Sequence, residues 1–218
     1  MEPYCIKTDI LRDLKDEINS INAALWASLK ERTDAPSTGE FLCSEEFLKI
    51  SFSSNILEDI TLLDTLSGNP LFKIRHGNMI IRDMVEQVIE FIYLIKNKHL
   101  ITEYMGMNVA DNSSLLNPIK AFRKLTSDRF SGGRKKVAEM AKDIGEKKSR
   151  EGNLTLYELY QILSEECHNS YYLSNLDIIQ EIETREEPMA LTKEQVQNLI
   201  IVIDRFMNVF RGSVPYSA

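Results

Sequence analysis

Cysteine, glycine and proline are all scarce in this chain, and each scarcity argues against a class of protein. The three cysteines, Cys5, Cys43 and Cys167, are an odd number without metal-ligand spacing, which favours free thiols in a reducing compartment over a disulfide framework. Nine glycines and six prolines in 218 residues are few for a turn-rich β architecture. No segment alternates apolar and polar residues over a convincing length, as a half-buried strand would. These scarcities together favour long helices.

Long apolar runs are missing as well, and we expect no leader peptide. No apolar run approaches the length that spans a bilayer, and the first ten residues lack a basic start followed by an apolar stretch. We therefore expect a cytoplasmic protein that makes no membrane contact. A content of 43% hydrophobic and 27% charged residues is that of an ordinary globular protein. The length suits one sizeable core, so we predict a single helical domain over residues 1–218.

Charge is spread unevenly along the chain. The net charge is −7, yet residues 117–150 hold eleven basic and four acidic side chains, which makes that stretch +7 and leaves −14 elsewhere. Such asymmetry indicates either an anion-binding side on an acidic body or a solvated, lysine-rich helical surface. If the first holds, Lys147, Lys148 and Arg150 are candidate substrate contacts.

Apolar residues at helical spacing predict most of the elements. We predict helices at about 8–32, 44–67 (with a break near 53–54), 78–97, 115–126, 135–144, 154–168 and 175–183, and a last one from the Thr192 capping position to about 211. The 79–95 and 154–168 helices both carry wide apolar stripes, so we expect them to pack together at the centre. The predicted architecture is an all-α domain with its core over about 44–211 and residues 1–32 as an added helix.

Residues 153–170 hold the main candidate site. Thr155 and Glu158 match a capping box at the start of a helix. The polar side of that helix carries Tyr157, Gln161, Ser164, Glu165 and His168. The Glu165-x-x-His168 pair occurs once, whereas di-metal sites in helix bundles need it on two helices, so we predict no metal and no other cofactor.

Arg82 and Glu86 lie four residues apart and are therefore neighbours on the most apolar helix. An ionised arginine is costly in such a setting unless another group pairs with it. Two readings stay open: a structural ion pair, or part of a site shared with Glu165 or His168.

Three segments in order resemble a family of uncharacterised bacterial proteins: Arg82-x-x-x-Glu86 followed by Tyr93-Leu94, GGRKKVAEMAKDIG at 132–145, and LYELYQILSEECHNS at 156–170. That family is similar to the HEPN superfamily of helix-bundle proteins. The resemblance covers about 80–170 and implies a HEPN-like bundle that forms a homodimer. Many HEPN proteins are metal-independent ribonucleases of toxin–antitoxin or antiphage systems, and others bind nucleotides.

The HEPN signature is an arginine a few residues before a histidine at the end of a helix. His168 matches the histidine, but Gln161 stands where the arginine is expected, and Arg82 could supply the missing cation. The resemblance therefore implies an endoribonuclease with a degenerate motif, in which His168, Arg82, Glu86 and Gln161 form the catalytic set. The alternative is a non-catalytic module that binds RNA, a nucleotide, or an antitoxin or defence partner protein.

Overall fold

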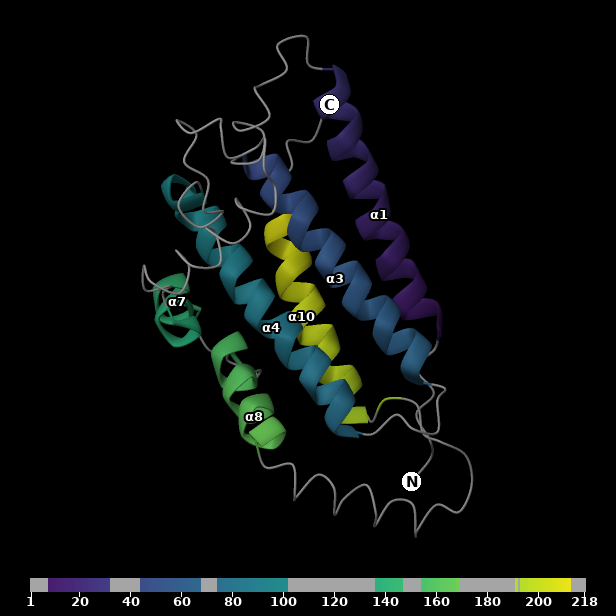
Figure 1. Cartoon of the computed structure of the whole chain (residues 1–218), viewed down its shortest axis with the longest axis vertical. Helices are drawn as coiled ribbons and strands as arrows, with labels where there is room; N and C mark the ends of the chain where they lie inside the picture. Colours follow the sequence, from purple (N-terminus) through teal and green to yellow (C-terminus); the bar gives the residue numbers. More distant parts are fainter. Residues whose placement is uncertain are drawn as a thin grey trace, which may run out of the picture.

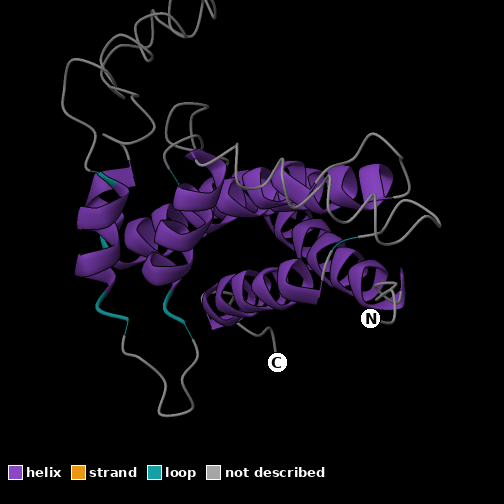
Figure 2. Ribbon diagram, turned by 90° about the horizontal axis from the view of Figure 1, so that it is seen from below, coloured by secondary structure: helices purple, strands orange, loops and turns teal. Residues whose placement is uncertain are grey.

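The predicted helices that fall on described residues are present and form the framework of that part of the chain. The computed structural model describes residues 8–31, 44–67, 74–101, 136–146, 154–168, 191 and 193–212, and no strand occurs among them (Figure 2). The described elements are α1 (Thr8–Glu31), α3 (Glu45–Ser67), α4 (Ile74–Lys96), the short 3-10 helix η1 (Lys98–Leu100), α7 (Val137–Ile144), α8 (Leu156–His168) and α10 (Lys193–Gly212). The all-α prediction is confirmed.

Some predictions fall on other parts of the chain. The helices expected at 115–126 and 175–183, the Thr192 capping position and most of the basic stretch lie outside the described residues. Of the helices that are described, none is long and apolar enough to cross a membrane.

Helix α4 lies at the centre because its apolar residues cover most of its circumference. It packs against α3, α7, α8 and α10, and Figure 1 shows it in front of α10 with α3 alongside. Ile81, Val88, Phe91 and Leu94 of α4 are completely or almost completely buried. A helix that is apolar on most sides is stable only where neighbours cover it.

The position of α8 differs in part from the prediction. The expected packing of α8 against α4 is confirmed, but α8 lies on the outside of the bundle beside α7 (Figure 1). Helix α8 buries Leu156, Leu159 and Leu163 along one stripe only. The second central helix is α10, which buries residues from Leu199 to Phe210.

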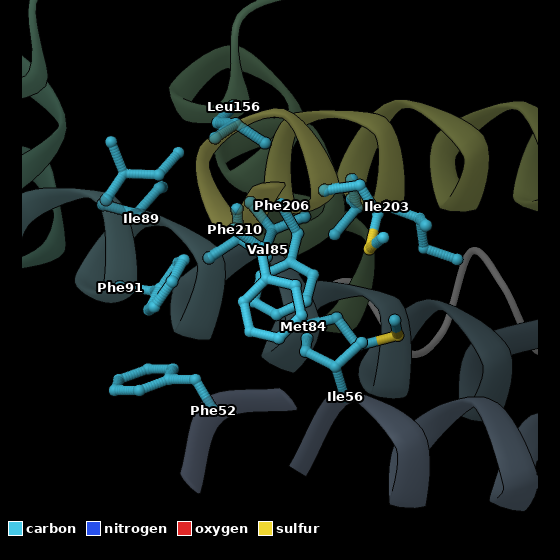
Figure 3. Close-up of a cluster of buried hydrophobic side chains, with 14 of the residues drawn as sticks. Phe52, Ile56, Met84, Val85, Ile89, Phe91, Leu156, Ile203, Phe206 and Phe210 are labelled. Atoms are coloured by element: carbon cyan, nitrogen blue, oxygen red, sulfur yellow. The ribbon is translucent and has the colours of Figure 1, made fainter. Parts of the chain in front are cut away.

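A cluster of phenylalanines joins α3, α4 and α10. The ring centroid of Phe91 lies 5.5 Å from that of Phe52 and 5.1 Å from that of Phe206, and Phe206 lies 5.1 Å from Phe210 (Figure 3). Large rings at these separations bury much apolar area and add a favourable ring–ring term. This cluster holds α3 and α4 together, which matters because the site lies between them.

Helix α3 runs without the break that we expected near residues 53–54. Ser53 is buried, and its hydroxyl oxygen lies 2.7 Å from the Lys49 carbonyl oxygen and 2.6 Å from Asn22 Oδ1 of α1. A serine that bonds to the carbonyl four residues back is compatible with a continuous helix. Ser53, one of the two serines that suggested a break, therefore ties α3 to α1 instead.

Candidate functional site

The beginning of α8 is built as the sequence predicts. The Glu158 backbone N–H donates to Thr155 Oγ1 at 3.2 Å, and the Thr155 N–H donates to Glu158 Oε2 at 3.0 Å. A further acceptor comes from outside the helix, because Glu146 Oε2 accepts from the Leu156 N–H at 2.8 Å. The other oxygen of Glu146 lies 2.8 Å from Arg205 Nε of α10. The first turn of α8 is thus held at a fixed place on the bundle.

The end of α8 is held by a buried amide. Asn78 of α4 is almost fully buried, and its Nδ2 donates to Glu166 Oε2 at 2.7 Å. Its Oδ1 accepts from Gln195 Nε2 of α10, also at 2.7 Å. Burial, reinforced by the nearby charge of Glu194, raises the pKa of Glu166, and the hydrogen bond from Asn78 opposes that rise. Asn78 therefore links α8 and α10 just before the turn that carries His168.

Arg82 is the main polar contact between α4 and α8. Its Nε donates to Ser164 Oγ at 2.9 Å, and its Nη2 donates to Tyr160 Oη at 3.0 Å. The guanidinium carbon also lies 5.1 Å from the centre of the Tyr160 ring, a cation–π distance.

The ion pair between Arg82 and Glu86 is loose. The shortest distance, from Nη2 to Glu86 Oε2, is 3.7 Å, and the two side chains are 30% and 25% exposed. A partly solvated pair at this distance neutralises little charge. The guanidinium is thus oriented mainly by two neutral hydroxyls and keeps its charge, while its Nη1 has no hydrogen-bond partner among the described residues.

A groove of about 490 Å³ opens beside this contact, between α3, α4 and the end of α8. The described residues that line it are Asp59, Met79, Ile80, Arg82, Asp83, Cys167 and His168. The groove thus combines a guanidinium, an imidazole, two carboxyl groups and a thiol. No three His, Cys, Asp or Glu side chains in the described part of the chain are grouped so that they could hold a metal ion.

The two carboxyl groups of the groove share one donor. Gln87 Nε2 donates to Asp59 Oδ2 at 2.9 Å and to Asp83 Oδ2 at 2.7 Å. Burial raises the pKa of Asp59 to about 6, and repulsion from Asp83 and Glu58 adds to the rise, against the hydrogen bond from Gln87. Asp59 thus changes charge close to neutral pH.

Cys167 is not activated by its position in the groove. Burial raises the pKa of its thiol, and Glu166 adds to the rise, whereas the charge of Arg82 lowers it. Reactive cysteines have depressed pKa values, so this thiol stays protonated near neutral pH.

The structure brings together some of the residues that we singled out from the sequence. Arg82 and His168 line the groove, and Ser164 contacts Arg82 directly. Glu86 contacts Arg82 but is not among the described residues that line the groove. Gln161 is exposed and does not line it either, because it lies seven residues, or about 10 Å along the helix, before His168.

The remaining predicted contacts are dispersed. Tyr157 is half-buried and Glu165 is exposed, and neither lines the groove. Lys147, Lys148 and Arg150 lie outside the described residues.

Sequence reasoning left several residues out of the site, among them Tyr160, Asp59 and Asp83. Tyr160 lies four residues before Ser164, so its place on the same face was readable from the helical repeat. Asp59 and Asp83 had no such signal, because isolated aspartates on helices are normally solvated surface residues.

No family model matches this chain, and no curated protein or solved structure matches it either. The likeness to HEPN proteins therefore stays a prediction. What the groove can do follows from its own chemistry. A fixed cation can bind a phosphate. The imidazole of His168 and the carboxyl group of Asp59 are side chains of the kinds that transfer protons in enzymes.

Proposed function

We propose that this protein is a HEPN-like endoribonuclease that cleaves RNA in the groove between α3, α4 and α8 without a metal ion. One observation carries the proposal: Arg82 and His168, which lie far apart in the sequence, line one groove. The helix that ends in His168 also supplies Ser164 and Tyr160, the two hydroxyls that orient Arg82. The cation and the proton-transfer group are thereby positioned by the same helix.

The proposed reaction cleaves the RNA chain by transesterification, in which the attacking oxygen comes from the RNA itself. The 2′-oxygen of a ribose attacks the adjacent phosphorus, and the bond from phosphorus to the 5′-oxygen breaks. The products are a 2′,3′-cyclic phosphate and a 5′-hydroxyl, so one proton leaves the 2′-oxygen and one reaches the 5′-oxygen. His168 transfers one of these protons, and Arg82 stabilises the charge that develops on the phosphate oxygens.

A second candidate function is a module that binds RNA or a nucleotide without cleaving it. Gln161 favours this alternative, because it is a neutral amide at the position of the motif arginine, is exposed, and is not among the described residues that line the groove. Among the described residues that line the groove, Arg82 is then the one guanidinium, and it does not occupy the motif position. A single guanidinium suffices to bind a phosphate but stabilises a transition state less.

Cleavage of a fluorophore–quencher RNA oligomer in buffer containing EDTA tests the proposal. The wild-type protein should cleave it, and His168→Ala should lower the rate about 100-fold or more, which is the usual contribution of a proton-transfer group. His99→Ala is the matched control, because His99 is exposed in η1 at the opposite end of α4. It should leave the rate unchanged, whereas Gln161→Arg should raise it.

Binding of the same oligomer separates the two candidates. Arg82→Ala should weaken binding, whereas Arg211→Ala, which removes an exposed partner of Glu17 on the far end of α10, should not. Arg82-dependent binding without any cleavage would support the binding module. Absence of both cleavage and binding would contradict both candidates.

A further inference from the structure

The groove offers a second proton-transfer group that the HEPN signature does not contain. Asp59 lies on α3, outside the segments that carry the family resemblance, and lines the groove together with His168 and Arg82. Its carboxylate is oriented by Gln87, whose amide nitrogen contacts Asp59 Oδ2 and Asp83 Oδ2 at once. An NH₂ group has two hydrogens, so it can serve both acceptors and hold the carboxylates in place.

The second oxygen of Asp59 is left available. Gln87 is the only hydrogen-bond donor to Asp59 among the described residues, and it uses Oδ2. Asp59 Oδ1 can therefore accept a proton or a hydrogen bond from a molecule bound in the groove. When Arg82 binds a phosphate of an RNA chain, we expect a hydroxyl group of the neighbouring ribose to be this partner.

We propose that Asp59 is the general base of the RNA cleavage, a role that rests on the function proposed above. Asp59 takes the proton from the 2′-hydroxyl as the 2′-oxygen attacks phosphorus. His168, in its protonated form, gives a proton to the 5′-oxygen as that bond breaks. The protein ends with a neutral carboxyl group and a neutral imidazole, and proton exchange with water restores both. Each proton is thereby accounted for without a metal-bound hydroxide.

The electrostatic surroundings of Asp59 suit this role. Glu58 on the same helix and Asp83 on α4 repel the ionised form of Asp59, and Arg82 and His168 line the same groove. Burial, with repulsion from Asp83 and Glu58, raises the pKa of Asp59 to about 6. Such a carboxylate is more basic than an ordinary aspartate but is still ionised at neutral pH, as a general base requires.

The other groups of the groove are poorer candidates. Asp83 is exposed, so water competes for its carboxylate. We assign it two supporting roles: it helps to position Asp59 through Gln87, and its charge raises the pKa of Asp59. Cys167 holds its proton, because burial raises its pKa.

The pH dependence of cleavage tests the assignment. For the wild-type protein, kcat/KM in EDTA buffer should rise with pH through about 6, as Asp59 loses its proton. Asp59→Asn should lower kcat/KM about 100-fold or more and abolish that rise. Asp83→Asn should shift the rise to lower pH, because its charge no longer repels the ionised form of Asp59. A purely structural role of Asp83 would not move this profile.

Asp13→Asn is the matched control, because Asp13 is exposed on α1 and does not line the groove. It should leave the profile unchanged. Asp59→Asn that retains the wild-type rate and its rise with pH would overturn the inference and leave the ribonuclease proposal standing. A wild-type protein without cleavage would overturn both. Thermal unfolding of Asp59→Asn verifies that any loss of activity occurs in folded protein. Asp83→Asn keeps the Asp59 carboxylate, so the shift of its kcat/KM profile to lower pH tests the assignment independently.

Discussion

Replacing Asp59 by asparagine should stabilise the folded protein above pH 6 and leave its stability unchanged in acid. The pKa of Asp59 rises from 3.8 to about 6 on folding, so the folded protein holds this proton more tightly than the unfolded chain. The resulting stabilisation is complete below pH 3.8 and is lost as the pH rises through about 6. Asparagine is neutral at every pH and still accepts a hydrogen bond from Gln87, so the variant escapes that loss.

The size of the effect follows from the shift and from the exposure of the side chain. A rise from 3.8 to about 6 corresponds to roughly 3 kcal/mol for a carboxyl group fully shielded from water. Asp59 is only partly buried, and solvent screening should reduce the difference in the free energy of unfolding to about 1–2 kcal/mol.

Urea unfolding followed by circular dichroism, at a series of pH values on both sides of 6, measures this difference. Asp13→Asn, on the exposed side of α1, should give a small difference that does not depend on pH. The reasoning is refuted if Asp59→Asn is less stable than the wild type in mildly alkaline buffer. It is equally refuted if its stability difference does not change with pH.

Three further predictions concern packing, capping and assembly. Gly77→Ala should lower the free energy of unfolding by about 1–2 kcal/mol, because a Cβ would lie 2.6 Å from Gln195 Nε2 and disrupt the buried hydrogen bond from Gln195 to Asn78 of α4. An unchanged Tm would contradict this. Glu158→Ala removes the acceptor for the Thr155 N–H, and the free energy of unfolding measured in urea should fall by about 1 kcal/mol. Glu165→Ala is the control, because Glu165 is exposed on the same helix, and it should leave the stability unchanged. Light scattering at micromolar concentration should report the homodimer that the HEPN resemblance implies, and a monomer would count against it.

Local patterns in the sequence were enough to determine most of the described helices. Thr155 and Glu158 form the predicted capping box because both partners lie within one turn of the same segment. The apolar stripe from Leu199 to Phe210 is buried as its spacing required. Arg82 and Glu86 were likewise identified as neighbours from their spacing alone, although their ion pair is looser than a buried setting implied.

The packing of α8 against α4 was expected from the sequence, but the other contacts between helices were decided by the tertiary structure. An apolar stripe shows that a face is buried but not which helix covers it. The sequence therefore did not reveal that α10, rather than α8, shares the centre with α4. Asp59 is an unremarked aspartate in the sequence, and it enters the groove only because α3 packs against α4 beside Asp83 and Gln87. A pKa depends on the water and the charges around a group, whatever their distance along the chain. The acid–base character of the groove is therefore a property of how three helices pack.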